Sequence, residues 1–327
     1  MAFVKPSVEV FESAVALAVR APSVHNTQPW RWRLSETAIH LYADASRQLS
    51  VTDPTQRELL MSCGAALHHM RVALAMLGWS ARVTHCPDPD DPDHLARIQL
   101  TAAHPTAADI ELAAAIAHRR SDRRRYGSRE VQSRHVRTVS GSAAASGAVA
   151  RQVPASLRAP LARAAHLAAD RHAADDDYLG ELASWTGRTD STDGVPAGST
   201  PPFRPQDEVP QRAFTHATLT DTDEETDASE WLVVCTASDT RVDQLRAGEA
   251  ASALLLTATG LGLASCMQTE PLELPDLRAA IRTELLYDCA FPHAIIRLGW
   301  LPATAAPLRS IPRRDPAEVI DTPASAH

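Results

Sequence analysis

The residues best suited to binding chemistry lie in the segment 20–32, RAPSVHNTQPWRW. Its two prolines prevent a helix from continuing, and Ser23 and Asn26 form turns by bonding to nearby backbone. Asn26 and Gln28 can each donate and accept hydrogen bonds, as the polar edge of a planar ligand requires. Two interpretations follow. The segment is either a rigid ligand-binding loop, or a connector whose polar residues stabilise turns and whose tryptophans fill a core.

A second group of candidate residues lies in the segment 119–125, RRSDRRR, where five of seven residues are arginine. A phosphate monoester is bound well by forked guanidinium donors together with a hydroxyl or backbone N–H. Arg119, Arg120, Ser121 and Arg123 offer such a set. Arg313 and Arg314 could complete it from the C-terminal tail. The alternative is a solvated basic face.

Other chemistries have weaker support in the sequence. The five cysteines are scattered and never spaced as CxxC, which favours buried, reduced thiols. No HExxH motif occurs, and the adjacent His68 and His69 of a predicted helix point in different directions, so we expect no metal site. The acidic segment 87–93 contains three prolines that break the periodicity of a calcium loop, which favours a solvated turn. Residues 260–262, GLG, end a predicted helix and therefore do not form a dinucleotide fingerprint.

Length, composition and charge limit the possible partners and location. The chain has 327 residues, of which 44% are hydrophobic and 5% aromatic, enough for two lobes with a helix-rich core. A net charge of −8 argues against a general role in nucleic-acid binding. We find no apolar run of membrane-spanning length and no signal peptide at the N-terminus. We therefore expect a cytoplasmic protein without a nucleic-acid or membrane partner.

Hydrophobic periodicity and capping residues predict alternating helices and strands. We expect helices at 7–20, 54–77, 109–118, 131–145, 157–182, 244–262 and 272–286. We expect strands at 30–34, 39–41, 81–85, 95–100, 149–153, 231–236 and 294–298. The helical segments 63–78 and 247–262 resemble each other, since each has a glycine, an Ala- and Leu-rich stretch and a final glycine, which suggests an internal repeat.

The segment 185–229 has no clear period and is rich in Thr, Pro, Gly and Asp. A loop of this length inside a compact chain is usually functional or disordered. Because Trp185, Phe203 and Phe214 give it apolar anchors, we favour an ordered lid over a free tail.

Several of these motifs carry a resemblance to a known family. The sequence APSVHNTQPWRW of residues 21–32 resembles the APSxxNxQPWxF segment of the flavin-dependent nitroreductases. RRSDR at 119–123 resembles the RRSxR phosphate-binding segment of the same family. Further matches are the helix 248–262 ending in GLG, the segment TEPLE at 269–273, the last strand region 291–300, and IPRRDP at 311–316. The segments WRWRL, TDP…REL and GWLP resemble the Acg-like actinobacterial branch.

The family order of the motifs is changed in this chain. The phosphate-binding segment usually precedes the APS segment, but here it follows about a hundred residues later. An internal duplication explains the split, because one chain would then imitate a family dimer with one complete and one degenerate FMN site. We therefore predict an N-terminal half, 1–117, that supplies the APS loop. The C-terminal half, 118–327, would supply the phosphate clamp and a lid-like insertion at about 185–229.

The resemblance implies an α+β, nitroreductase-like fold in two pseudo-symmetric halves, with mainly antiparallel sheets flanked by helices. It implies FMN as cofactor, NAD(P)H as a possible reductant, chemistry on flavin N5 without a catalytic side chain, and a monomer. The residues that it places at the cofactor are Pro22, Ser23, Asn26, Gln28, Arg119, Arg120, Ser121, Arg123, Glu270, Pro271, Leu272, Arg313 and Arg314.

Three functions stay open from the sequence. The first is an oxidoreductase that passes hydride from NAD(P)H through FMN to a small-molecule acceptor that the sequence does not identify. The second is a protein that binds FMN under a lid without turnover, as a store or sensor. The third is a flavin-free scaffold that keeps the fold.

Overall fold

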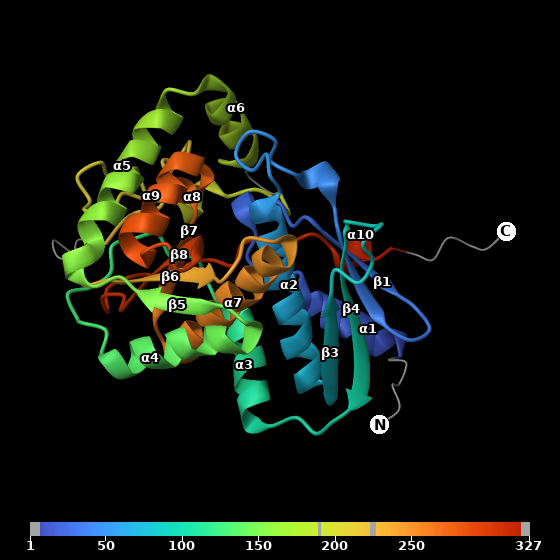
Figure 1. The fold of residues 1–327 in the computed structure, drawn as a ribbon. Coiled ribbons are helices and arrows are strands. Elements are labelled where there is room, and N and C mark those ends of the chain that lie inside the picture. The colour runs from blue at the N-terminus through green and yellow to red at the C-terminus, as the bar shows by residue number, and fades with distance from the viewer. Residues whose placement is uncertain (1–6, 189–190, 223–226, 322–327) are drawn as a thin grey trace.

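The computed structural model describes residues 7–188, 191–222 and 227–321, and it contains two four-stranded antiparallel sheets (Figure 1). The first sheet has the order β1-β2-β4-β3, and the second has the order β5-β6-β8-β7. The strands of the first sheet are β1 (Trp30–Leu34), β2 (Ile39–Ala43), β3 (Trp79–His85) and β4 (His94–Ala102). Those of the second are β5 (Val149–Gln152), β6 (Glu230–Thr236), β7 (Ala264–Gln268) and β8 (Phe291–Gly299).

The first sheet packs against α1 (Val8–Ala18) and α2 (Arg57–Met76). Trp30 and Trp32 are fully buried on β1, and they pack into the same core as Leu67 and Met70 of α2. The alternation of buried and less buried residues along β1 and β2 is that of strands covered on one face. The interpretation that the two tryptophans fill a core is therefore confirmed.

The second sheet is covered on both faces. One face packs on α4 (Ser133–Gly141) and α7 (Arg241–Gly260), and the other on α5 (Arg158–Ala173) and α9 (Pro275–Leu286). Because both faces are buried, β6 is apolar from Trp231 to Cys235, and β8 contains the apolar run 294–296.

The two halves meet where α2 crosses α7, near the centre of the molecule (Figure 1). At this crossing the helices are in backbone contact through two glycines. A Cβ on Gly64 would lie 2.0 Å from the Leu245 carbonyl oxygen, and a Cβ on Gly248 would lie 2.0 Å from the Met61 carbonyl oxygen. Gly64 thus faces Leu245, three residues before Gly248, and Gly248 faces Met61, three residues before Gly64. The contact is therefore reciprocal.

The structure changes several predicted boundaries. The helix predicted at 157–182 is two helices, α5 and α6 (Asp176–Trp185), because the Asp175 side chain accepts a hydrogen bond from the Tyr178 N–H and starts a new helix. The helix predicted from residue 54 begins at Arg57, and the one predicted from 109 is α3 (Ala107–His118), capped by Thr106. The helix predicted at 272–286 is two helices, the short α8 (Glu270–Glu273) and α9, which begins at Pro275. The tail contains α10 (Pro316–Val319), and Ile320 pairs with Trp32 at the edge of β1.

One helix of the described residues bears on the expectation about apolar runs. Helix α2 is 20 residues long and contains a window with a mean hydropathy of 1.3, which meets the length and composition of a membrane span. However, 83% of that window is buried inside the protein, as in a central core helix.

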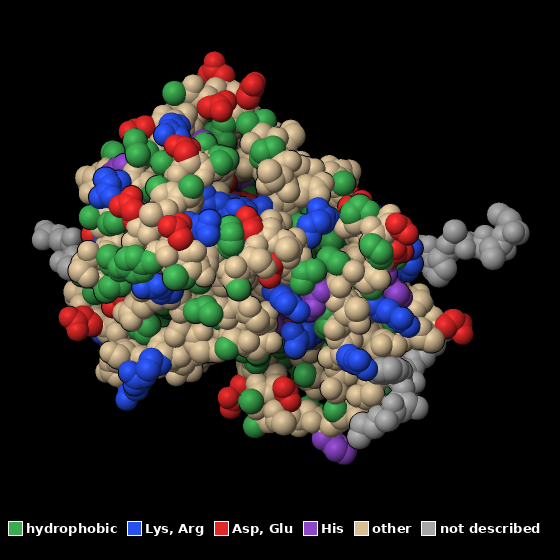
Figure 2. All heavy atoms as spheres, viewed as in Figure 1, with side chains coloured by type: hydrophobic (Ala, Val, Ile, Leu, Met, Phe, Trp, Pro, Cys, Tyr) green, Lys and Arg blue, Asp and Glu red, His purple; other side chains and the backbone are tan. Residues whose placement is uncertain are grey.

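On the face shown in Figure 2, basic and acidic side chains are interspersed rather than gathered by sign.

Candidate functional site

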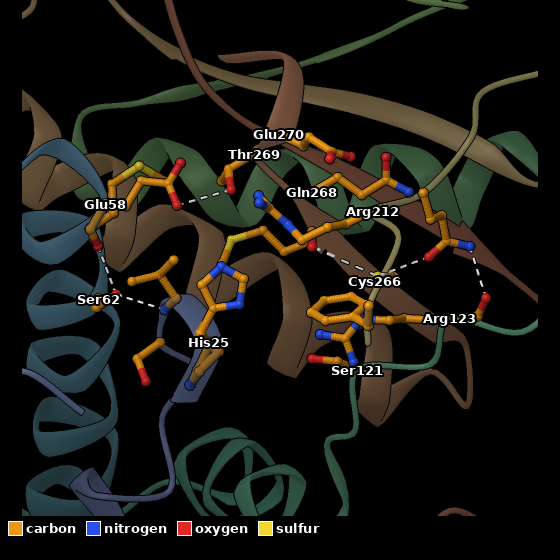
Figure 3. Close-up of a pocket in the computed structure, with 17 residues that line it drawn as sticks. His25, Glu58, Ser62, Ser121, Arg123, Arg212, Cys266, Gln268, Thr269 and Glu270 are labelled. Carbon is orange, nitrogen blue, oxygen red and sulfur yellow. Dashed lines mark hydrogen bonds between the residues drawn. The ribbon is translucent and has the colours of Figure 1, made fainter. Parts of the chain in front are cut away.

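The motif residues gather around one cleft between the two halves. It has two ends that share Pro22, Ser23, His25, Ser121 and Arg123. We call the end that also contains Arg20, Arg119, Arg120 and Arg313 the basic end. We call the other the carboxylate end, because Glu58 and Glu270 line it together with Ser62, Arg212, Phe214, Cys266, Gln268 and Thr269 (Figure 3).

The loop after α1 is held in an unusual backbone conformation. His25, Asn26 and Gln28 all have positive φ, at 43°, 56° and 52°. Side chains rarely adopt this left-handed region without support from their surroundings. Two hydroxyls provide it here. The Ser23 hydroxyl accepts a hydrogen bond from the Gln28 N–H at 3.0 Å, and the Ser62 hydroxyl of α2 accepts one from the Val24 N–H at 3.1 Å.

The Asn26 and Gln28 amides bind protein backbone. Asn26 Nδ2 donates to the Gly194 carbonyl at 3.1 Å, and Gln28 Nε2 donates to the Thr192 carbonyl at 2.8 Å. Gln28 Oε1 accepts from the Arg314 N–H at 2.9 Å. Asn26 still lines the basic end, but Gln28 is fully buried away from the cleft. The two amides thus fasten a distant loop and the tail to this segment.

The basic end gathers four arginines from three separate segments. Within the described residues, Arg20, Arg119, Arg120 and Arg313 form no ion pair with a carboxylate, and the Nε of each is buried without a hydrogen-bond partner. Burial, together with the repulsion of the neighbouring guanidinium groups, lowers the pKa of Arg119 to about 10 and that of Arg313 to about 9. Such a cluster favours an anion in its midst.

Of the other three arginines in the segment 119–125, Arg124 and Arg125 form ion pairs within the protein, and Arg123 lines the cleft. Arg124 forms a buried ion pair with Asp122 at 2.7 Å, and Arg125 pairs with Asp207 at 2.6 Å. Arg123 lines both ends of the cleft, and its guanidinium lies 4.7 Å from the centre of the Phe214 ring. The predicted phosphate-binding residues Arg119, Arg120, Ser121 and Arg123 therefore come together at the cleft.

The carboxylate end is crowded with ionisable groups. Glu58 is buried in the first turn of α2, and its Oε1 accepts from Arg57 Nη2 at 3.1 Å. Thr269 precedes α8, and Glu273 at the end of α8 pairs with Arg212. Burial raises the pKa of the Cys266 thiol, which makes it a poor nucleophile.

The segment 191–222, which we call the lid segment, reaches across the cleft. Asp193 pairs with Arg47, which lies between β2 and α2. Gln211 Nε2 donates to the Arg123 carbonyl at 2.8 Å, and the Phe214 ring meets the His25 ring edge-on at 6.0 Å. These contacts hold the described part of the insertion against the residues that line the cleft.

Several predicted cofactor residues have other positions in the structure. Of the pair in the tail, Arg313 lines the basic end, whereas Arg314 Nη1 lies beside Asp44 at 3.8 Å and does not line the cleft. In α8, Glu270 lines the cleft, but Pro271 and Leu272 do not, because Leu272 packs into the core under the second sheet. Arg314, Pro271 and Leu272, like Gln28, therefore do not line the cleft.

Sequence reasoning missed several residues that line the cleft. Arg20 and His25 lie within or beside the APS motif and could have been included. Glu58 and Ser62 lie on the face of α2 that is turned toward the loop. Because they are polar residues in the first two turns of a predicted helix, they could have been considered as candidates. Arg212 lies in a segment without periodicity, so nothing in the sequence pointed to it, and Phe214 of the same segment was predicted only as an apolar anchor of the lid.

Comparison with known proteins decides the family. "Putative NAD(P)H nitroreductase Rv3131" of Mycobacterium tuberculosis is 44% identical over 321 residues, which cover 97% of this chain and 93% of the relative. The chain belongs to the nitroreductase family. "Putative NAD(P)H nitroreductase acg" of the same organism is 37% identical over 327 residues, covering 98% of this chain and 97% of the relative. The resemblance to the Acg-like branch and the nitroreductase-like α+β fold are confirmed.

Two further comparisons complete the picture. No family model matches the nitroreductase chain described here. Among solved structures, the FMN-dependent nitroreductase NfnB from Mycobacterium smegmatis in complex with NADPH is similar, with 17% identity and a TM-score of 0.43. That similarity covers 66% of this chain and 100% of NfnB.

Proposed function

We propose that this nitroreductase binds FMN in the cleft and acts as an oxidoreductase that transfers hydride from NAD(P)H, through the flavin, to a small-molecule acceptor. The observation that carries the proposal is the basic end. Four guanidinium groups gather there without a carboxylate partner among the described residues. The names of the relatives, which include NAD(P)H nitroreductase, agree with this activity.

The residues present fit the chemistry of FMN. A phosphate monoester would take hydrogen bonds from Arg119, Arg120 and Arg313, whose Nε groups are buried without partners. The Ser121 hydroxyl lies where the two ends of the cleft meet. At the carboxylate end, the unpartnered Gln268 Nε2 is the kind of group that binds the polar edge of a flavin. When bound, FMN would supply two-electron hydride chemistry, and the protein would position it and shield it from water.

The first test is an anaerobic absorbance titration of the purified, flavin-loaded protein with NADPH and with NADH. We expect the flavin absorbance to bleach at stoichiometric reductant and to recover when an acceptor such as a nitroaromatic or a quinone is added. A protein that gains no flavin absorbance after incubation with FMN would contradict the cofactor assignment and favour a flavin-free scaffold.

The arginine cluster gives a second, quantitative test. Replacing Arg120 with Ala removes a charged donor from the phosphate, and hydrogen bonds to charged groups contribute about 1.5–3 kcal/mol. We therefore expect the Kd for FMN, measured by flavin fluorescence, to rise about 10- to 100-fold. The matched control is Arg163→Ala, because Arg163 lies on α5 in an exposed pair with Glu284 and should leave the Kd unchanged. Equal affinity of Arg120→Ala and wild type would remove Arg120 from the site.

One observation favours a second candidate function, the binding of FMN without turnover. The lid segment is tied to the first half by Asp193, Gly194 and Thr192, and Phe214 lies against the residues that line the cleft. A lid fastened this way would exclude a nicotinamide from the flavin. A bound flavin that dithionite reduces but NADPH and NADH do not would favour this function over the oxidoreductase.

We also propose that the chain is a duplicated monomer with one FMN. The equal strand orders of the two sheets and the reciprocal glycine contact support this proposal. Light scattering coupled to size exclusion should then give the mass of one chain, 35.3 kDa, with about one flavin per chain. An obligate dimer with a flavin at each subunit interface would refute it. A cytoplasmic location, where NAD(P)H is available, is part of the same proposal.

A further inference from the structure

The carboxylate end contains a hydroxyl shared by two glutamates. Thr269 Oγ1 lies 3.0 Å from Glu58 Oε2 and 3.0 Å from Glu273 Oε1. Glu58 lines the cleft with Thr269, as Figure 3 shows, whereas Glu273, at the end of α8, is not among the lining residues. Both glutamate side chains are almost fully buried.

The count of hydrogens favours a proton on one of these carboxyl groups. A hydroxyl has one hydrogen, so Thr269 can donate a full hydrogen bond to only one of the two carboxyl oxygens. With both carboxyl groups ionised, the other oxygen would lie 3.0 Å from the hydroxyl in a buried site without a hydrogen between them. A proton on that carboxyl group makes the second contact a hydrogen bond as well.

The oxygens that already accept hydrogen bonds from arginine point to Glu58 as the carboxyl group with the proton, while Glu273 Oε2 is buried without a hydrogen-bond partner. On Glu273, the oxygen that faces Thr269 is the same Oε1 that accepts from Arg212 Nη2, so it is an acceptor already. On Glu58, Arg57 Nη2 binds Oε1, which leaves Oε2 to carry a hydrogen toward Thr269. With this assignment, Glu58 donates a hydrogen bond to Thr269, and Thr269 donates one to Glu273. Glu273 Oε1 also accepts a hydrogen bond from the Arg212 cation.

The charged groups around Glu58 agree with this assignment. Burial is the main cause that raises the pKa of Glu58 well above its usual value, and the negative charges of Glu273 and Asp53 raise it further. The positive charges of Arg57 and Arg212 oppose that shift without cancelling it.

We propose that Glu58 holds a proton in the resting protein and delivers it to the acceptor bound at the carboxylate end. This inference rests on the proposed oxidoreductase function. Two-electron reduction of an acceptor such as a quinone or a nitro group adds a hydride and a proton. The hydride, with both electrons, comes from the cofactor reduced by NAD(P)H. The Glu58 O–H bond breaks, its proton joins the acceptor oxygen, and solvent then returns a proton to the Glu58 carboxylate.

The proton can be tested without any flavin, by infrared spectroscopy of the apo-protein at pH 8. Asp53 is ionised at this pH, because burial raises its pKa only to about 6. We expect a protonated-carboxyl C=O band that shifts in D2O and is absent in Glu58→Gln. The matched control is Glu249→Gln. Glu249 is buried but pairs with Arg71 and His85, which lower its pKa, so this variant should keep the band. A wild-type spectrum without the band, or a band that survives in Glu58→Gln, would overturn the proposal.

The role in proton delivery is tested by separating the two half-reactions. Glutamine at 58 can accept from Arg57 and donate to Thr269 as a protonated glutamate does, so the variant should fold and bind FMN. It has no proton to give, and we expect reoxidation by a quinone to slow at least 10-fold and to lose its solvent isotope effect. Reoxidation as fast as in wild type would refute proton delivery by Glu58. Failure of NAD(P)H to reduce the wild-type flavin would instead refute the oxidoreductase function, while the infrared result on Glu58 would stand.

Discussion

The glycine contact between α2 and α7 makes a specific prediction about stability. Replacing Gly64 with Ala would place a Cβ 2.0 Å from the Leu245 carbonyl oxygen, about 1 Å closer than real Cβ contacts allow. The obstacle is backbone on a buried helix, so no flexible side chain can move aside. Overpacking of a core typically costs 1–3 kcal/mol, and this contact belongs at the upper end of that range. The better helix propensity of alanine offsets about 1 kcal/mol. We therefore expect a net loss of about 2 kcal/mol or more.

The assay is urea unfolding followed by circular dichroism, with the free energy of unfolding taken from linear extrapolation. The matched control is Gly180→Ala in the exposed part of α6, where an added Cβ meets nothing within 4 Å. This control should be neutral or stabilising by up to about 1 kcal/mol.

The reciprocity of the contact can be measured as well. Gly248→Ala should destabilise about as much as Gly64→Ala, because its Cβ meets the Met61 carbonyl oxygen at the same 2.0 Å. The double variant should lose less than the sum of the two, since helices already separated by one alanine accommodate the second more easily. A Gly64→Ala protein as stable as wild type, with the Gly180 control behaving as described, would refute a close-packed crossing. Strict additivity would show that the two contacts are independent.

Three further predictions concern charge and assembly. Asp53 has its pKa raised by burial from 3.8 to about 6, so its contribution to stability is full below pH 4 and is lost as the pH rises through about 6. The free energy of unfolding should fall across that interval by at most about 3 kcal/mol, and Asp53→Asn should remove this slope. Arg71→Ala should destabilise by about 3 kcal/mol in urea unfolding at pH 8, because it removes the guanidinium that pairs with the buried Glu249 carboxylate and leaves His85 as its ring-nitrogen partner. An unchanged midpoint would mean that water replaces the guanidinium. Size exclusion with light scattering should give a monomer both with and without FMN.

Much of the fold could be read from the sequence because the signals were local. The stripe of apolar residues on α2 and the buried runs of β6 and β8 predicted these elements within a few residues. The break between α5 and α6 was missed because alanines on both sides favour helix and a single side chain, Asp175, ends the pattern.

The candidate site was predictable only in part, because residue type does not determine the partner. Arg120 and Arg124 belong to the same run of arginines, yet Arg124 pairs with Asp122 while Arg120 faces the cleft. Gln28 was selected for its amide, and that amide binds Thr192 and Arg314, which are distant in sequence. Arg212 reaches the cleft from a segment without periodicity. Such assignments depend on tertiary contacts that no local pattern contains.

The four arginines of the basic end also bear on how much of the protein a cell would hold. Guanidinium groups held together without an anion repel one another, so the ligand-free fold carries a cost that a bound phosphate group removes. Ligand that binds only the folded chain shifts the folding equilibrium in proportion to its concentration over its Kd. Chains made when the ligand is scarce would be less stable and more exposed to proteolysis. The abundance of this protein would then follow the supply of its phosphate-bearing ligand without any change in gene expression.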